Sequence, residues 1–338
     1  MLSFVQKRWF VLSLLVLITG GLSTGSVASD ATIESLTGRI HPRAVTALVL
    51  FLMSFSLNSG QLKASLQSPR PVLWASAVNY GMIPVMAWVL MHVQLNDDFA
   101  IGLMIAGSVP CTMAAASVWT RKAGGNDAVS LLVTVLTNGG CFVLTPLWLN
   151  LATIGGVGLD ATQMMYRLVI AVLLPTLAGQ AIRLVPRAST FATTYKTPIG
   201  VVAQSCILAL VFKAACGAGT RLQGTGLAEN LGGFLWVWVC CIVIHLAAMA
   251  IGLFGARRFG FSTEDRAAVA FASSQKTLPI GVLLATDVTM FGNPDLLGIG
   301  VGVPFAVFPM LMYHASQLFI DTAVADRLAA QKNAERAV

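Results

Sequence analysis

Lys276 is the residue whose type and position most directly suggest chemistry, because it lies in the middle of an apolar segment. Residues 273–279 around it read SSQKTLP. A lysine at the centre of a membrane span costs about 2.5 to 3.5 kcal/mol on insertion scales, so we expect it to face a cavity or a partner. It could replace a metal cation, attract an anionic substrate or couple transport to protons. The alternative is a lysine that extends to the membrane interface.

A second polar interruption precedes Lys276 by about half the chain. Residues 107–112 read GSVPCT, and Pro110 there matches Pro279 in the later segment. In hydrocarbon every backbone amide must be paired, so a mid-span proline is tolerated where protein or water covers the break. Unwound helices would offer positive dipole ends to anions and free carbonyl oxygens to small cations. Either proline alone could mark a structural kink, but the matched pair predicts one shared transport site.

Other polar residues lie singly inside apolar segments, where each could simply join helices: Asn79, Asn138, Ser130, Thr134, Gln204, Lys213, His245 and His314. We interpret His245 and His314 as packing residues, because no carboxylate or cysteine stands at a spacing typical of a metal site. The six cysteines show neither CxxC nor Cys/His spacing, which disfavours zinc and disulfides. The absence of GxSxG, HExxH and Walker sequences predicts neither an enzyme nor ATP-driven transport, and no organic cofactor.

The composition shows what kind of element must position these residues. Of the 338 residues 56% are hydrophobic and only 10% are charged, against roughly 45–50% and 25% in soluble domains. The net charge of +7 comes from basic residues in short gaps between apolar runs, where they report membrane orientation. The sequence therefore predicts a polytopic protein of the lipid bilayer, without nucleic-acid binding.

Ten segments have the length of about 20 mostly apolar residues that a spanning helix needs. They are residues 9–25, 43–59, 71–92, 99–120, 127–151, 164–184, 197–218, 231–255, 266–288 and 297–320. Basic residues gather in the connectors of one face: Lys7, Arg8, Lys63, Arg70, Arg121, Lys122, Arg183, Arg187, Lys196, Arg257, Arg258, Arg266, Arg327, Lys332 and Arg336. The positive-inside rule then predicts a multi-pass protein of the cell membrane with both termini in the cytoplasm.

The first apolar segment, residues 9–25, could be either a membrane span or part of a signal peptide. It follows Lys7 and Arg8, and residues 27–29 resemble a signal-peptidase site. We interpret it as a retained helix, because its removal would leave an odd number of spans and break the charge pattern. Cleavage remains the alternative.

The ten spans divide into two halves of five within one membrane domain, residues 1–338. The first repeat covers 9–151, the second covers 164–320, and 324–338 form a solvated cytoplasmic tail. Because five is odd, the second half enters the membrane in the opposite orientation. This is the inverted repeat that many secondary transporters use.

Residues 110–128, which read PCTMAAASVWTRKAGGNDA, resemble the bile acid:sodium symporter family, as do Thr134, Asn138 and residues 144–146. Residues 273–279 are similar to a divergent branch with vertebrate and bacterial members. The resemblance implies an all-α fold of ten transmembrane helices in two inverted five-helix repeats. Spans 3 to 5 and 8 to 10 would form a core and spans 1, 2, 6 and 7 a panel, with the broken helices 4 and 9 crossing at mid-membrane.

The resemblance also implies two cation-site positions. In sodium-coupled members one site uses a Ser-Asn pair, a serine, a threonine and a span 9 glutamate; the matching residues are Ala116, Ser117, Ser130, Thr134 and Phe271. The other site uses two glutamines, which correspond to Asn79 and Gln275. Lys276 takes the place of an asparagine beside the substrate path. Because a monovalent cation needs several oxygen ligands, the lost asparagine and glutamate place sodium coupling in question and leave protons as another coupling ion.

These patterns predict secondary active transport of a small organic anion by alternating access. Candidate substrate-binding or charge-compensating residues are Lys276, Thr112, Ser273, Ser274 and Thr277. A membrane regulator or scaffold that kept the fold is one alternative. Arsenite efflux through Cys111 is another, although the span 9 glutamate of those carriers is absent. The sequence leaves the substrate, the direction of transport and the oligomeric state open.

Overall fold

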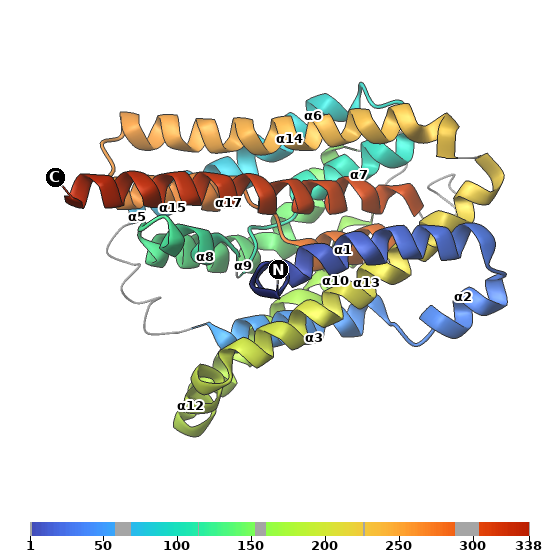
Figure 1. Cartoon of the computed structure of the whole chain (residues 1–338), viewed down its shortest axis with the longest axis horizontal. Helices are drawn as coiled ribbons and strands as arrows, with labels where there is room; N and C mark the ends of the chain where they lie inside the picture. The colour runs from blue at the N-terminus through green and yellow to red at the C-terminus, as the bar shows by residue number, and fades with distance from the viewer. Residues whose placement is uncertain are drawn as a thin grey trace.

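The computed structural model describes residues 2–57, 69–113, 115–152, 160–225, 227–287 and 304–337, and in these ranges the chain is helical without a β-strand (Figure 1). The longer helices are α1 (Leu2–Val27), α3 (Pro42–Ser56), α7 (Asp97–Ser108), α9 (Asp127–Leu151), α11 (Leu174–Arg183), α13 (Lys196–Thr225), α14 (Leu227–Arg258), α15 (Thr263–Ser274) and α17 (Val307–Ala337). The shorter ones are α2 (Asp30–Thr37), α5 (Pro69–Ala77), α6 (Ile83–Met91), α8 (Ala115–Lys122), α10 (Ala161–Leu168), α12 (Pro186–Thr194) and α16 (Leu278–Thr286). Two single turns are π-helical, at Val78–Met82 and Val169–Leu173, and one is a 3-10 turn at Pro304–Ala306.

Seven helical runs in the described ranges are long and apolar enough to cross a membrane. They are Trp9–Val27, Pro69–Met91, Asp127–Leu151, Ala161–Arg183, Lys196–Thr220, Leu231–Arg258 and Thr263–Thr286. The chain is therefore a multi-pass membrane protein, as its composition predicts, and its described part is all-helical.

Three of the ten expected spans are not among these seven. The segment 43–59 corresponds to α3, which ends at Ser56, and residues 58 and 59 lie outside the described residues. The segment 99–120 is divided between α7 and α8. Residues 297–303 of the last expected span also lie outside the described residues, as does the connector residue Lys63.

The expected tail is the continuation of α17, which runs on to Ala337. This part of the helix packs against the rest of the protein. Ala325 is buried, and Lys332 Nζ donates to Gly124 O over 2.8 Å and contacts Glu264 Oε1 at 3.2 Å. The end of α17 is thus attached to α15 and to the connection between α8 and α9.

The helices pack in two groups. In one group α1 packs on α13, and α3 packs on α11 and α13. In the other, α15 contacts α5, α8, α9 and α14, while α17 lies beside α14, as Figure 1 shows. Contacts of α16 with α3 and α13 join the two groups. We call the first group the panel and the second group, which includes both interrupted helices, the core.

The panel helices α1 and α13 approach each other at backbone distance. A Cβ atom added to Gly25 would collide with Cys216 O, and one added to Gly219 would collide with Leu22 O. Small residues permit this close approach between membrane helices, where van der Waals packing supplies much of the attraction. Glycine therefore determines how tightly α1 fits the panel.

The core is organised around α15 and α16, in which every residue from Ala267 to Ala285 is buried. Five of the eight residues from Ala267 to Ser274 are alanine or valine and two are serine, so neighbouring helices can come close on every side. The first turn of α15 is capped: Ser262 Oγ accepts from Asp265 N at 3.1 Å, and Glu264 and Asp265 complement the positive end of the helix dipole.

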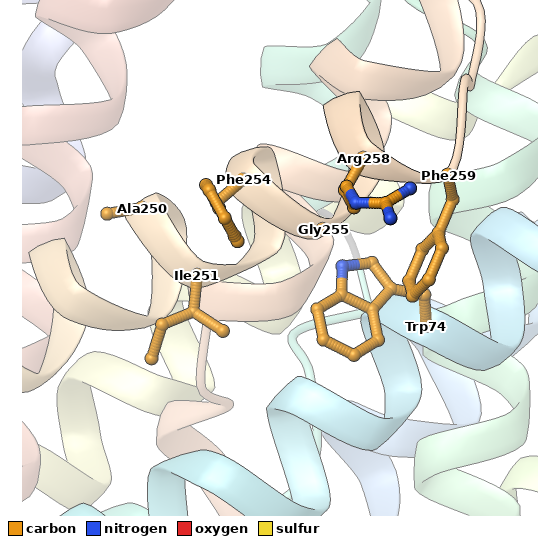
Figure 2. A pocket seen from close by; sticks show the side chains of 7 residues that line it. All are labelled: Trp74, Ala250, Ile251, Phe254, Gly255, Arg258 and Phe259. Atoms are coloured by element: carbon orange, nitrogen blue, oxygen red, sulfur yellow. The ribbon is translucent and has the colours of Figure 1, made fainter.

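A tryptophan anchors α5 to α14. Figure 2 shows the Trp74 indole lying across Gly255, at a hollow of about 380 Å³ that Ile251, Phe254, Arg258 and Phe259 also line. Trp74 Nε1 donates to Gly252 O at 3.0 Å, and the Phe259 ring stands edge-on to the indole with the centroids 5.2 Å apart. At Gly252 and Gly255, where no side chain intervenes, the main chain of α14 therefore contacts the indole ring.

Adding a methyl group at Gly255 is expected to destabilise the protein. Its Cβ would collide with the Trp74 ring, and such overpacking costs about 1 to 3 kcal/mol. We expect Gly255→Ala to lower the midpoint of thermal unfolding in detergent. Gly232→Ala, on the same helix, is the matched control because its Cβ would meet nothing within 4 Å. Equal midpoints for the two variants would contradict this packing.

Candidate functional site

The chain leaves the helical conformation at both predicted interruptions. Helix α7 ends at Ser108, and Val109 before Pro110 is extended, with ψ 158°. This is the conformation that a following proline favours. Helix α15 ends at Ser274, and α16 starts at Leu278 with Pro279 in its first turn, where the missing amide N–H is tolerated.

The two interruptions touch each other. Thr277 N donates to Pro110 O over 2.9 Å, although the residues lie in different halves of the chain. The segment from Ser273 to Thr277 is completely buried. The structure therefore joins the two polar clusters into one buried site.

Lys276 lies at the centre of this site rather than at a membrane interface. Its side chain is fully buried. Nζ donates to Asn79 O at 2.7 Å, to Val109 O at 2.8 Å and to Asn79 Oδ1 at 3.1 Å. An ammonium group has three N–H donors, and these oxygens satisfy all of them. Nζ also stands 5.3 Å from the centre of the Tyr80 ring, a cation–π contact.

Asn79 connects span 3 to the end of α15. It lies in the π-helical turn Val78–Met82, a local widening that is frequent at functional sites. Its Nδ2 lies within hydrogen-bond distance of Ala272 O at 3.2 Å, Ser273 O at 3.3 Å and Gln275 O at 2.9 Å. The last carbonyl groups of a helix have no partner within the helix. Asn79 therefore caps the broken end of α15 while its Oδ1 accepts from Lys276.

Asp321 supplies a buried carboxylate that the sequence interpretation missed. It lies on α17 with no exposed surface; Oδ2 accepts from Gln275 Nε2 and Oδ1 lies 3.0 Å from His245 Nε2. His245 Nδ1 is 3.2 Å from Ser274 O. His245 is buried, as the interpretation of a packing residue predicts, and its carboxylate partner was missed because it comes from another helix.

Gln317 holds the main chain of Lys276 from the same face of α17. Its Oε1 accepts from Lys276 N at 2.9 Å, and its Nε2 donates to Lys276 O at 3.0 Å. Its Nε2 also lies 2.7 Å from His314 Nδ1. Residues 314, 317 and 321 share one face by helical spacing, a signal that the sequence contained.

The first expected cation position does not offer free oxygen ligands. Ser117 Oγ accepts from Arg121 Nη1 at 2.8 Å, so a fixed positive charge is next to it. Ser130 Oγ is 2.6 Å from Thr120 Oγ1, and Phe271 at the glutamate position is completely buried in an apolar cluster. Thr134 Oγ1 donates to Ser130 O and to Thr112 O. These residues fit a sodium ion poorly.

At the second expected cation position, protein groups occupy part of the site. The amide oxygen of Asn79 accepts from Lys276, and the amide nitrogen of Gln275 faces Asp321. Gln275 Nε2 thus anchors the Asp321 carboxylate, while the amide oxygen of Gln275 has no hydrogen-bond partner among the described residues. Within the described ranges, no group of three or more histidine, cysteine or acidic residues could hold a metal ion.

The remaining candidates divide by their contacts. Ser273 and Ser274 donate to main-chain carbonyl groups: Ser273 Oγ to Ala248 O at 3.5 Å and Ser274 Oγ to Ala270 O at 3.0 Å. Thr277 Oγ1 and Gln275 Oε1 are buried without a hydrogen-bond partner among the described residues. Cys111 is also buried, and its Sγ is near Thr112 O and Thr134 Oγ1. Thr277 therefore has a hydroxyl group available at the junction.

Comparison with known proteins identifies the type of molecule. Residues 8–330 match the SBF-like CPA transporter family. Sodium/bile acid cotransporter 7 of Danio rerio is 23% identical over 331 residues, covering 95% of this chain and 93% of the relative. The Mus musculus protein of that name is 21% identical over 337 residues, covering 96% and 93%. The "Probable sodium/metabolite cotransporter BASS4, chloroplastic" of Arabidopsis thaliana is 25% identical over 339 residues, covering 96% and 73%.

These relatives confirm the resemblance that residues 110–128 and 273–279 predict, including the branch with vertebrate members. The matched family and the relatives are transporters rather than enzymes. At 21 to 25% identity they establish the type of protein and leave the solute to be argued from the site.

Proposed function

Because this chain belongs to the SBF-like CPA transporter family, we propose that it is a secondary active transporter of a small organic anion. The observation that carries this proposal is the contact between the two helix interruptions around the buried Lys276 ammonium. A buried positive charge among unwound helix ends attracts an anion and repels a cation. The scaffold or regulator alternative does not explain this arrangement.

The architecture proposed for this function has ten transmembrane helices in two inverted repeats, in the cell membrane, with both termini cytoplasmic. The core, with α15 and α17, would move against the panel, with α1, α3 and α13. The two groups of helices support this division, because most of their packing is internal. Access to the junction of the interruptions would then alternate between the two sides.

In this proposal Lys276 takes the electrostatic role of a bound sodium ion. Three oxygens hold its Nζ, as oxygen ligands would hold a cation. The guanidinium group of Arg121 beside Ser117 and the apolar Phe271 further disfavour sodium at the other position. Transport is therefore independent of sodium, in contrast to what the names of the relatives state for those proteins.

The solute anion would bind next to Thr277. Its hydroxyl group has no partner among the described residues, and the first turn of α16 follows it directly. The positive end of this helix dipole and a free hydroxyl donor both favour a carboxylate or sulfonate group. Arsenite efflux has less support, because the Cys111 thiol is buried between Thr112 and Thr134.

Counterflow in proteoliposomes tests this proposal. Vesicles containing the purified full-length chain and unlabelled taurocholate or succinate are diluted into trace amounts of the labelled anion. We expect labelled anion to accumulate transiently, and equally when choline replaces sodium. Protein-free vesicles are the control. Counterflow that requires sodium would contradict the role of Lys276, and a folded protein without counterflow of either anion would contradict this substrate class.

A further inference from the structure

The His245 ring contacts two oxygen atoms, Ser274 O and Asp321 Oδ1. Hydrogen bonds to both oxygens require one proton more than a neutral imidazole and an ionised carboxylate carry. Ser274 O, at 3.2 Å from Nδ1, is a carbonyl oxygen and can only accept a hydrogen bond. A hydrogen bond at this contact therefore requires a hydrogen on Nδ1. A neutral imidazole with hydrogen on Nδ1 has a lone pair on Nε2.

The other ring nitrogen faces an oxygen that is also electron-rich. Nε2 is 3.0 Å from Asp321 Oδ1, a hydrogen-bond distance. With a neutral ring and an ionised carboxylate, two lone pairs would oppose each other there. The contact is favourable when one additional proton lies between the atoms, either on Nε2 or on Oδ1.

We propose that His245 and Asp321 form a proton-binding site, and that its proton is the ion that moves with the anion. This inference rests on the proposed transport function. Loss of the proton to water leaves a neutral imidazole and a carboxylate, and the ring can then satisfy only one of its two contacts. It must release either Ser274 O, at the end of α15, or Asp321 on α17.

Binding of the proton by His245 and Asp321 is thereby linked to the main-chain conformation between α15 and α16. Ser274 is the last residue of α15, and its carbonyl also accepts from Tyr313 at 2.7 Å. Gln275, the next residue, donates to the second oxygen of Asp321. A change in the charge of Asp321 therefore affects Ser274 and Gln275, the two residues that precede Lys276.

The charges around the pair determine which solute the protonated state accepts. Titratable groups that interact with the pair within the described residues are Tyr313 on α17, whose ring centre is 5.7 Å from that of His245, and Cys111 beside Pro110. Lys276 directly follows Gln275, which donates to Asp321. With the proton in place, the pair is neutral overall and Lys276 leaves one positive charge. Without it, Asp321 balances Lys276. The protonated site thus favours a monovalent anion, and proton and anion move together.

Titration of His245 tests the proton site without any solute. The chain has four histidines, His41, His92, His245 and His314, so nitrogen-15 spectra of histidine-labelled protein are simple, and His245→Gln identifies the signals. We expect the His245 ring signals to change with pH in one transition. Asp321→Asn should remove this transition, because the asparagine amide donates to Nε2 at every pH. His245 signals that do not change with pH in the natural chain would overturn the proposal.

Uptake driven by a pH gradient tests the coupling. Proteoliposomes with a more acidic exterior should accumulate labelled taurocholate, and Asp321→Asn should reduce this to the level of protein-free vesicles. Asp326→Asn is the matched control on the same helix, since its side chain is 58% exposed and pairs with Lys122. Accumulation driven by sodium and indifferent to pH would overturn the coupling while preserving the transport function. If the chain moves no anion at all, the transport function fails, and the titration alone then supports or overturns the proton site.

Discussion

Lys276→Met is expected to abolish anion uptake and to lower the free energy of unfolding by about 3 kcal/mol. Methionine has a similar length but no N–H donor, so Asn79 O, Asn79 Oδ1 and Val109 O lose their shared partner. A buried acceptor left without a partner costs about 1 to 3 kcal/mol, and removal of the buried charge offsets part of the sum. Counterflow of taurocholate and thermal unfolding in detergent measure the two effects.

Lys213→Met provides the matched control for this substitution. Lys213 also lies in a membrane helix, on α13, and its Nζ donates to Thr37 O at 3.1 Å. It is half-buried and bonds to the end of α2 rather than to either interruption, so we expect its loss to leave counterflow intact. Similar losses of counterflow in the two variants, or none in Lys276→Met, would rule out a specific role for the buried ammonium.

Asn79→Leu is expected to destabilise the protein even more, by about 3 to 5 kcal/mol, because it leaves a buried charge with an incomplete set of partners. The substitution removes the side-chain oxygen Oδ1, one of the three acceptors of Lys276 Nζ. It also removes the amide nitrogen that caps the carbonyl groups of Ala272, Ser273 and Gln275. Thermal unfolding measures the loss directly. Counterflow should disappear as well, because the end of α15 loses its cap.

A double-mutant cycle distinguishes this mechanism from simple loss of packing. If Asn79 serves to hold the Lys276 charge, the variant carrying both Asn79→Leu and Lys276→Met should be less destabilised than the sum of the single variants. We expect a coupling free energy of about 1 to 3 kcal/mol. Additive effects would show that the two residues act independently.

The sequence predicted the interruptions well, because they depend on local chemistry. Proline cannot continue a helix, and polar residues in a membrane span must meet other polar groups. The positions of Pro110, Lys276 and Pro279 were sufficient for this. The resemblance to the family added Asn79 and Gln275 as cation-site positions, and the structure brings both next to Lys276.

The partners from α17 could not be predicted in the same way. Asp321 directly follows the last expected span, residues 297–320, so hydropathy placed it outside the membrane segments. The helix in fact continues to Ala337, and only its rotation against α14 and α15 brings Asp321 to His245. Similarly, Ser117 matches a cation position along the chain, but its contact with Arg121 depends on how α8 ends. Such contacts depend on tertiary packing rather than on periodicity.

The hydrogen bond from Thr277 to Pro110 has a consequence for how such a protein diversifies. It joins two main-chain groups, an amide nitrogen and a carbonyl oxygen, and neither belongs to a side chain. The crossing can therefore persist while the side chains around it are exchanged. Evolution is free to alter the solute that the junction recognises, or the ion that accompanies it, without rebuilding the scaffold that holds the two broken helices together.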